Sequence, residues 1–411
     1  MMHIPTLIAR KREGEILADG EIRSLIEGFT RGEVTDAQMA AFAMAVFFRG
    51  MTAEETAALT YSMLESGERF QFSGDHPPVV DKHSTGGIGD KVSLILAPLV
   101  ACCDCWIPMV SGRGLGITGG TLDKLESIPG FRVGLSIEEA QRQLRRIGVV
   151  MMGQTEQFCP ADKKLYALRD VTGTVPSIPL ITASIMSKKL AESLDRLVLD
   201  VKFGSGAFMQ TFEQAEELAG AMQAVGNAMG VQVFTEINPM DEPLGCAVGN
   251  ALEVVESLAI MRGEGPPDLL ALVLSQAEKI TQCTQDQLLE KISSGQVMDK
   301  FCELAIAQNA SIERLFEMNV VHQAPVIRDV LSVESGVVTR FDAGRIGQAA
   351  LELGAGRNKA SDAVDPRVGF DTLVKVGSSL ERGEVIARIH SRNADDADRA
   401  EAAVRQALVL G

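Results

Sequence analysis

The sequence VVDKHSTGGIGDKVSLILAPLVACC, residues 79–103, decides the fold of the central part of the chain. Its first two residues, Val79 and Val80, are typical of a short buried strand, and the run DKHSTGG at residues 81–87 is polar and glycine-rich, as expected of a loop. Residues 90–103 return to a mostly apolar pattern, which predicts a helix. The stretch therefore predicts a strand, a glycine-rich loop and a helix in that order.

The same order of elements follows in WIPMVSGRGLGITGGT, residues 106–121. Residues 106–110 predict a strand, residues 111–120 a second glycine-rich loop, and Thr121 the start of a helix. Another buried strand is predicted at residues 197–201. Strands that alternate with helices form parallel sheets, and the loops after such strands meet at one edge. We therefore expect an α/β fold with two glycine-rich loops close together.

The chain before this region is predicted to be helical. Apolar residues recur at helical spacing in residues 21–29, Thr35 is expected to begin the next helix, and Thr52 and Glu55 form the capping-box pattern of a third. Residues 162–194 have helical character again, and we expect them to rejoin the N-terminal helices. The helical domain is therefore expected to be discontinuous.

The last part of the chain changes character once more. Short strands around turns are predicted at residues 336–340, 372–376 and 385–390, which indicates a small α+β domain. The predicted division of the chain is a helical domain at residues 1–66 and 160–194, an α/β phosphate-binding domain at residues 67–159 and 195–325, and a C-terminal α+β domain at residues 326–411.

Composition excludes several classes of partner. The 39 basic and 55 acidic residues give a net charge of −16, so neither nucleic acid nor a membrane is an expected partner. The chain has no apolar run of about 18 residues and no secretory signal at its N-terminus, and we expect a cytoplasmic protein. Cys102, Cys103 and Cys105 lack a second ligand pair at zinc-binding spacing, so no metal site is predicted.

The two glycine-rich loops form a candidate anion site. Glycine lets backbone amides approach a ligand closely, and the start of a helix is electropositive. Lys82 adds a positive charge. Hydroxyl donors are available from Ser84, Ser93, Ser111 and Thr121. The glycine spacing fits neither a Walker motif nor a dinucleotide fingerprint, so a small anionic substrate is the expected ligand.

Three longer motifs resemble the signature of the thymidine and pyrimidine-nucleoside phosphorylase family. They are DKHSTGGIGD at residues 81–90, SGRGLG at 111–116 and GGTLDKLES at 119–127. Shorter matching motifs lie at residues 160–164, 169–170, 177–180, 187–189, 200–202, 249–251 and 354–362. The resemblance extends over nearly the whole chain. It implies a pentosyltransferase that cleaves pyrimidine nucleosides, with phosphate as co-substrate and no cofactor.

The resemblance also implies a homodimer in which a helical domain faces a larger α/β domain across a cleft. Phosphate would be bound on the α/β side by Lys82, Ser84, Ser93, Ser111 and Thr121. The pyrimidine would be held from the helical side by Arg169, Ser184 and Lys188. The spacing of the last two agrees with this, because residues four apart on a helix share a face.

The implied reaction is an attack of a phosphate oxygen on the anomeric carbon as the glycosidic bond breaks. Lys82 and the loop amides would orient the phosphate, while Arg169, Lys188 and His83 would stabilise the departing base. His83 is the expected proton donor because the pKa of an ordinary histidine lies near neutrality. Attack on the face opposite the base predicts inversion, and hence thymine and 2-deoxy-α-D-ribose 1-phosphate from thymidine.

Three features depart from the family pattern or bear on specificity. Ile117 stands where the family usually has histidine, which bears on substrate scope. Met109 matches the thymidine-selective members, whereas broad-range members have lysine there, so Met109 favours deoxyribosides. Broad-range members also bind a monovalent cation at positions that match Gly89, Lys91, Leu244, Ala247 and Glu256. We expect the Lys91 ammonium to pair with Glu256 and to replace that cation.

Several functions stay open on the sequence alone. The leading prediction is a thymidine phosphorylase that also accepts deoxyuridine, and the alternative is a broad phosphorylase that accepts uridine as well. A protein that binds nucleoside or phosphate without catalysis is favoured only by Ile117. A phosphoribosyltransferase of related fold would need acidic residues placed for magnesium diphosphate, and the sequence has no convincing set.

Overall fold

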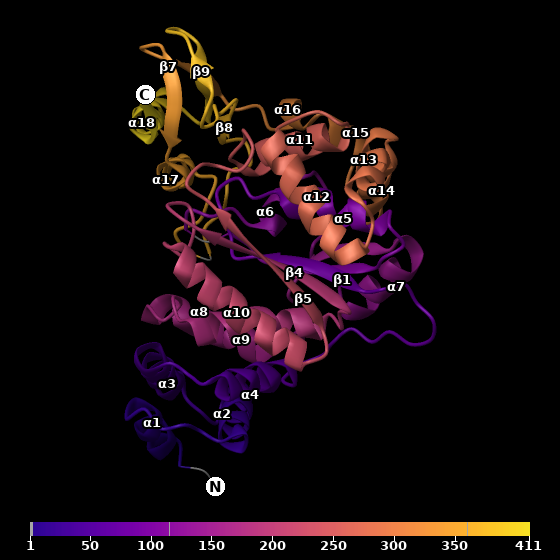
Figure 1. Cartoon of the computed structure of the whole chain (residues 1–411), viewed down its shortest axis with the longest axis vertical. Coiled ribbons are helices and arrows are strands. Elements are labelled where there is room, and N and C mark those ends of the chain that lie inside the picture. The colour runs from indigo at the N-terminus through magenta and orange to yellow at the C-terminus, as the bar shows by residue number, and fades with distance from the viewer. Residues whose placement is uncertain (1–2, 115, 360) are drawn as a thin grey trace.

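The computed structural model describes residues 3–114, 116–359 and 361–411, which form three regions in a row (Figure 1). A helical bundle lies at the end of the molecule that holds the N-terminus, and an α/β region with a central sheet follows it. A small α+β region lies at the opposite end, with the C-terminus. This arrangement confirms the predicted fold class. Within the described residues, no helix is long and apolar enough to cross a membrane.

The helical bundle is built from two separate stretches of the chain. Its helices are α1 (Ile4–Arg12), α2 (Asp19–Arg31), α3 (Asp36–Arg49), α4 (Ala53–Leu64), α8 (Pro160–Thr172) and α9 (Ile178–Ala191). Both stretches contribute to one apolar core, Phe42 from the first and Leu165 from the second. Thr35 and Thr52 cap α3 and α4 as predicted, because each side-chain oxygen accepts a backbone N–H of the first turn.

A parallel sheet forms the centre of the α/β region. Its strands are β1 (Val80–Ser84), β2 (Ile107–Ser111), β3 (Val149–Gly153), β4 (Arg196–Phe203) and β5 (Gln232–Pro239). The ladders β1-β4-β5 and β2-β3 are joined by a bridge between Val79 and Trp106, which gives the order β3-β2-β1-β4-β5. Because the pairs are parallel, the loops after β1 and β2 leave the same edge of the sheet.

The first strand differs from the sequence-based prediction. The sequence predicts a loop from residue 81, but β1 continues to Ser84. Asp81 can occupy a buried strand because it forms an ion pair with Lys189 of α9, and Lys82 can do so because it lies 3.5 Å from Asp90. Strands β3 and β5 were not predicted, although the apolar run at residues 149–152 is typical of a buried strand.

Helices cover both faces of the sheet. They are α5 (Val92–Ala101), α6 (Thr121–Ser127), α7 (Ile137–Ile147), α10 (Phe212–Ala228), α11 (Asn250–Met261), α12 (Pro267–Thr281), α13 (Gln285–Ser293), α14 (Gln296–Ala307), α15 (Ile312–Phe316) and α16 (Met318–Val321). Helix α10 packs on β4 and β5, between the sheet and the bundle (Figure 1). Helices α5 and α12 pack on the opposite face, so the sheet is buried on both sides.

The C-terminal region combines two small antiparallel sheets with two helices. Its elements are β6 (Val326–Leu331), β7 (Gly336–Phe341), α17 (Ala343–Leu353), β8 (Gly369–Asp371), β9 (Ser379–Leu380), β10 (Val385–Ser391), α18 (Ala394–Ala407) and β11 (Leu408–Leu410). The sheet orders are β6-β10-β8 and β11-β7-β9. The strand predicted at residues 372–376 is wrong. Thr372 has a φ of 55°, which ends the extended conformation after β8.

Candidate active site

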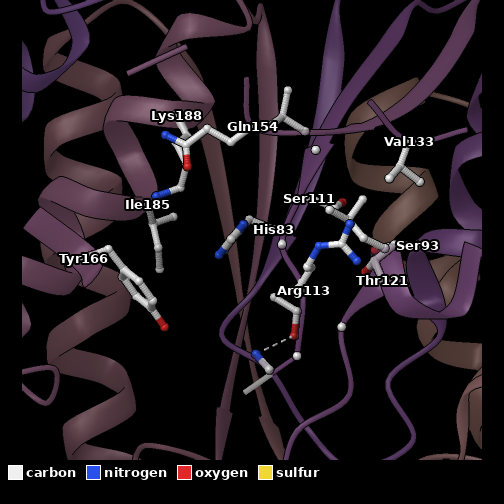
Figure 2. A pocket seen from close by; sticks show the side chains of 18 of the residues that line it. His83, Ser93, Ser111, Arg113, Thr121, Val133, Gln154, Tyr166, Ile185 and Lys188 are labelled. Atoms are coloured by element: carbon white, nitrogen blue, oxygen red, sulfur yellow. Dashed lines mark hydrogen bonds between the residues drawn. The ribbon is translucent and has the colours of Figure 1, made fainter. Parts of the chain in front are cut away.

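A cavity of about 1440 Å³ lies between the helical bundle and the carboxyl edge of the sheet. Helices α8 and α9 form one wall, and the ends of β1 and β2 with the loops that follow them form the other. Figure 2 shows Tyr166 and Lys188 on the helical wall, Ser93 and Thr121 on the sheet wall, and His83 between them. The cavity is therefore a cleft with two walls of different chemistry.

The sheet wall gathers the residues predicted to bind phosphate. Lys82, Ser84, Ser93, Ser111 and Thr121 all line the cavity. They come from β1, α5, the end of β2 and the first residue of α6. The Nζ atom of Lys82 lies 3.5 Å from Ser93 Oγ, and Ser84 Oγ accepts the Gly86 N–H at 3.2 Å. One ammonium and four hydroxyls thus converge, which is a donor set suited to a phosphate.

A carboxylate balances the charge of this wall. Asp90 lines the cavity, and its Oδ1 lies 3.5 Å from Lys82 Nζ. Burial by itself would raise the pKa of Asp90, but the ammonium groups of Lys82 and Lys202 outweigh burial and hold that pKa well below its usual range. Asp90 is therefore ionised at neutral pH. A phosphate bound here would share Lys82 with this carboxylate, so hydroxyls and backbone amides would have to supply part of its binding energy.

The helical wall gathers the residues predicted to hold the pyrimidine. Arg169 lines the cavity and donates to the carbonyls of Val175 at 2.6 Å and Leu180 at 2.8 Å. Burial lowers the pKa of Arg169 to about 10, so the guanidinium stays cationic at neutral pH. Its Nε also donates to the Thr174 carbonyl at 3.4 Å. Three carbonyls thus fix its orientation, and two of the five guanidinium N–H groups are left for a ligand.

Ser184 and Lys188 lie on the same face of α9, as predicted from their spacing. The Nζ atom of Lys188 lies 3.0 Å from Ser184 Oγ and 2.5 Å from Asp162 Oδ2 on α8. Since the Ser184 oxygen accepts from Lys188, its hydrogen can be donated to a carbonyl oxygen. The pair therefore offers an ammonium and a hydroxyl side by side.

His83 lies between the two walls, but its protonation state differs from the prediction. Burial lowers the pKa of His83 well below its ordinary value, and the ammonium groups of Lys189, Lys188 and Lys82 lower it further. The imidazole is therefore neutral at pH 7 in the protein without phosphate. It can donate an N–H hydrogen bond there, but it cannot act as a cationic acid. The prediction assumed an ordinary histidine pKa. The role of His83 as proton donor stays a prediction, and it requires that a bound substrate raise this pKa.

Two residues expected to influence specificity lie away from the cleft. Met109 is not among the described residues that line the cavity, and its side chain is buried in the core that also contains Met151. Val110, the next residue on β2, does line the cavity, which agrees with the alternation of side chains along a strand. Ile117 packs against the same core as Met109. The geometry therefore does not support direct contact of Met109 with a bound sugar.

Lys91 lies outside the cleft, in a buried cluster of oxygen atoms. Its Nζ donates to the carbonyl of Leu244 at 3.0 Å and to that of Ala247 at 2.9 Å, and it forms an ion pair with Glu256. Glu256 also accepts the Cys246 N–H at 2.8 Å. The ammonium thus contacts two carbonyls and one carboxylate, which is also a donor set for a metal cation.

Sequence reasoning missed four further residues of the cleft: Arg113, Tyr166, Lys189 and Arg357. Arg113 stands between glycines of the second loop, which could have marked it as a ligand-binding cation. Lys189 is buried between the carboxylates of Asp81 and Glu192, and only the fold brings these three together. Arg357 comes from the C-terminal region and lies in the family motif at residues 354–362, but the sequence alone does not show that this motif reaches the cleft.

Family models match all three regions of the chain. Residues 76–295 match a model described as "Glycosyl transferase family, a/b domain", and residues 5–67 match "Glycosyl transferase family, helical bundle domain". Residues 337–411 match "Pyrimidine nucleoside phosphorylase C-terminal domain". The three models follow one another along the chain in the order of the bundle, the α/β region and the C-terminal region.

Curated relatives match over nearly the whole length. The chain is 44% identical to the pyrimidine-nucleoside phosphorylase of Bacillus subtilis, over 98% of this chain and 95% of that one. It is also 44% identical to the thymidine phosphorylase of Agrobacterium fabrum, over 96% of this chain and 92% of that one. Among solved structures, the anthranilate phosphoribosyltransferase of Thermus thermophilus matches with a TM-score of 0.59 at 18% identity, over 74% of this chain and 99% of that one. The last likeness concerns the fold alone.

Proposed function

The chain belongs to the thymidine and pyrimidine-nucleoside phosphorylase family and is a pyrimidine nucleoside phosphorylase, and we propose that it prefers deoxyribosides. This proposal rests on the match of Met109 to thymidine-selective members and not on a contact of Met109 with the cleft. Its substrates would be thymidine and deoxyuridine, with inorganic phosphate. The roles proposed for the site residues rest on one observation, namely that two walls of different chemistry face each other across the cleft. A phosphate-type donor set lies on one, Arg169, Ser184 and Lys188 lie on the other, and His83 lies between them.

On the sheet wall, phosphate would bind through Lys82, Ser84, Ser93, Ser111 and Thr121. One phosphate oxygen attacks C1′ of the sugar on the face opposite the base. The C1′–N1 bond breaks, its electron pair leaves with the base, and the product is 2-deoxy-α-D-ribose 1-phosphate. The sugar becomes cationic on the way, so the adjacent phosphate both attacks and stabilises it. The protein positions the two substrates and stabilises the charges that develop, and it forms no covalent intermediate with the sugar.

On the helical wall, the residues would stabilise the negative charge of the departing pyrimidine. Arg169 lines the cleft and is held by three backbone carbonyls, so it would offer its remaining N–H groups to the base. Lys188 contacts Asp162 and Ser184, so a base oxygen would take the place of one of those contacts. His83 would first donate a hydrogen bond. The negative charge of phosphate beside Lys82 opposes the effect of the lysines and favours protonation of His83 in the complex.

The preference for deoxyribosides is tested by measuring phosphate-dependent release of free base from thymidine, deoxyuridine and uridine in parallel. Cleavage confined to the two deoxyribosides supports the proposal. Equal cleavage of uridine shifts the assignment to the broad enzyme. The relatives leave both outcomes open, because proteins with either name are 44% identical to this chain. Omission of phosphate is the control, since a hydrolase would still release base.

We also propose that the Lys91 ammonium takes the place of a monovalent cation. The proposal is supported by its three oxygen contacts, with the carbonyls of Leu244 and Ala247 and with Glu256. A fixed ammonium in that position holds the segment around residue 245 against the start of α5. The enzyme would then need no potassium, and its activity would be the same in buffers with and without that ion.

Exposed apolar residues on the helical bundle support the homodimer that the family resemblance implies. Phe48 of α3 is 75% exposed, and Met44 and Phe47 of the same helix and Ile16 before α2 are exposed as well. We propose that a second copy of the chain covers Phe47 and Phe48 in a homodimer, since their rings are in contact and both are exposed to solvent. Light scattering after gel filtration tests the proposal. Phe48→Glu is expected to give monomers, whereas Phe316→Glu, on an exposed position of α15, is expected to leave the dimer intact.

A further inference from the structure

The C-terminal region reaches into the phosphate wall through the segment that follows α17. The backbone carbonyl of Arg357 accepts the Gly116 N–H of the second glycine-rich loop at 2.9 Å. A Cβ atom on Gly356 would lie only 2.9 Å from the Gly116 carbonyl oxygen, so the two backbones are in close contact. Asn250, the first residue of α11, also contacts this segment, because its Nδ2 donates to the carbonyl of Ala355 at 2.9 Å.

The side chain of Arg357 continues this contact. Its Nη1 lies 2.7 Å from Asp123 Oδ1 and 3.5 Å from the Gly114 carbonyl oxygen, and its Nε donates to the Asp362 carbonyl at 2.8 Å. Both side chains of the ion pair are buried, with 9% of Arg357 and 2% of Asp123 exposed. The guanidinium is therefore fixed at three points, and it lines the cavity.

Asp123 connects this ion pair to the phosphate-binding backbone. It lies in the first turn of α6, two residues after Thr121, and its Oδ2 accepts the Gly114 N–H at 2.7 Å. The Asp123 carboxylate thus links Gly114, near the beginning of the second glycine-rich loop, to the first turn of α6, which follows that loop. A second cation, Arg113, is 3.5 Å from Asp123, but Arg113 is half-exposed and forms its closer ion pair with Glu126.

We infer that Arg357 is a positioning residue for phosphate, acting through Asp123 on the loop between β2 and α6. The inference rests on the proposed binding of phosphate to that loop. Arg357 has two effects there. It fixes the loop backbone that presents Ser111 and Thr121, and it neutralises a buried carboxylate that would otherwise repel the phosphate anion. This gives the C-terminal region a part in the active site.

The test is steady-state kinetics of purified full-length variants with phosphate and thymidine varied separately. Arg357→Ala is expected to raise the KM for phosphate by about ten- to hundredfold, as a small misplacement of binding groups can. The KM for thymidine is expected to stay within about twofold. Arg357→Lys keeps the positive charge but loses the planar guanidinium with its several N–H donors. Its KM for phosphate should lie between those of the wild type and Arg357→Ala. Arg367→Ala is the matched control, because Arg367 lies in the same segment, is 44% exposed, and pairs with Asp365.

A double-mutant cycle separates positioning from direct contact. If Arg357 acts through Asp123, Arg357→Ala should have little further effect on the phosphate KM in the Asp123→Asn background. Additive effects would overturn the positioning role through Asp123, because they would mean that Arg357 acts independently of that carboxylate. Equal rises in both KM values would overturn it as well, since general loss of structure has that result. If Arg357→Ala does not fold, the KM values of Arg357→Lys for phosphate and for thymidine provide the same test.

Failure of this inference differs from failure of the proposed function. If the wild-type protein releases no base in the presence of phosphate, the function is wrong. If the wild type is active and the phosphate KM of Arg357→Ala equals that of Arg367→Ala, only the role of Arg357 is wrong. Protection of the wild type by phosphate against thermal unfolding, compared with that of Arg357→Ala, provides a readout that does not depend on turnover.

Discussion

Replacement of Lys91 by alanine is expected to convert the enzyme into one that depends on potassium. The Lys91 side chain has 0% exposure and Glu256 has 11%, so their ion pair is almost entirely removed from solvent. Lys91→Ala leaves the Glu256 carboxylate and the carbonyls of Leu244 and Ala247 around a space without a cation. Removal of one partner of a buried pair costs about 3–5 kcal/mol. In buffer without potassium, the variant should therefore be less stable and less active than the wild type.

Potassium should reverse this loss, because the three remaining oxygens are ligands for a cation. An ion present at about 100 times its dissociation constant stabilises the folded state by about 2.7 kcal/mol, which would recover most of the expected cost. The assay is the initial rate of base release and the half-life of heat inactivation, in potassium chloride and in tetramethylammonium chloride of equal ionic strength. The tetramethylammonium ion is too large for the space that a lysine ammonium leaves.

A matched control is available in the helical bundle. Lys11 and Glu55 form an ion pair of 2.8 Å with 3% and 1% exposure, far from the oxygens around Lys91. Lys11→Ala should lose stability to a similar degree, but potassium should not restore it selectively. Two results would refute the reasoning: a wild-type rate that rises with potassium, or a Lys91→Ala variant that recovers equally in both salts.

Three further predictions concern the cleft. The pKa of His83 is lowered in the folded state, so the unfolded chain binds more protons as pH falls below about 6.5, and stability is lost there at up to about 1.4 kcal/mol per pH unit. In urea unfolding at pH 7.5 and 5.5, His83→Gln should lose less stability on acidification than the wild type, and an equal loss would contradict the lowered pKa. Ser184→Ala removes a hydroxyl beside Lys188 and should raise the KM for thymidine by about five- to thirtyfold, corresponding to about 1–2 kcal/mol, with the phosphate KM unchanged; a rise in the phosphate KM instead would argue against a pyrimidine role. Met109→Leu conserves volume in the core and should cost under about 1.5 kcal/mol without changing the ratio of thymidine to uridine cleavage. A changed ratio would restore Met109 as a specificity residue.

The sequence predicted the fold well where each element carries its own local signal. The capping threonines of α3 and α4 and the two strand–loop–helix units are of this kind, since propensity and periodicity act within a few residues. The end of β1 was missed because its residues are charged. Asp81 is accepted in a buried strand only through Lys189, which is supplied by α9 more than 100 positions later. A pattern in neighbouring residues cannot reveal a partner so distant in sequence.

The same limit applies to the active site. Family motifs supplied the residues of both walls, and these residues do line one cavity. They did not supply the environment that sets the behaviour of each residue. The neutral state of His83 depends on burial and on three lysines, one beside it on β1 and two on α9. The orientation of Met109 depends on which face of β2 it occupies. The part of Arg357 depends on a contact between regions distant in sequence.

Helix α9 connects the two walls and limits how they can move. Its first half lies in the core of the bundle through Leu180, and its second half lies in the core beneath the sheet through Leu190. Two adjacent lysines of α9 form ion pairs with different regions. Lys188 pairs with Asp162 of α8 in the bundle, whereas Lys189 pairs with Asp81 of β1 in the sheet. The Lys189 pairs are buried, so separating the end of α9 from the sheet would expose unpaired charges at a high cost. We therefore infer that the end of α9 stays attached to the sheet in any movement of the bundle, and that residues 160–194 do not move as one body. Hydrogen exchange with and without phosphate and thymine tests this: a common change along all of α9 would show that the helix moves as a unit.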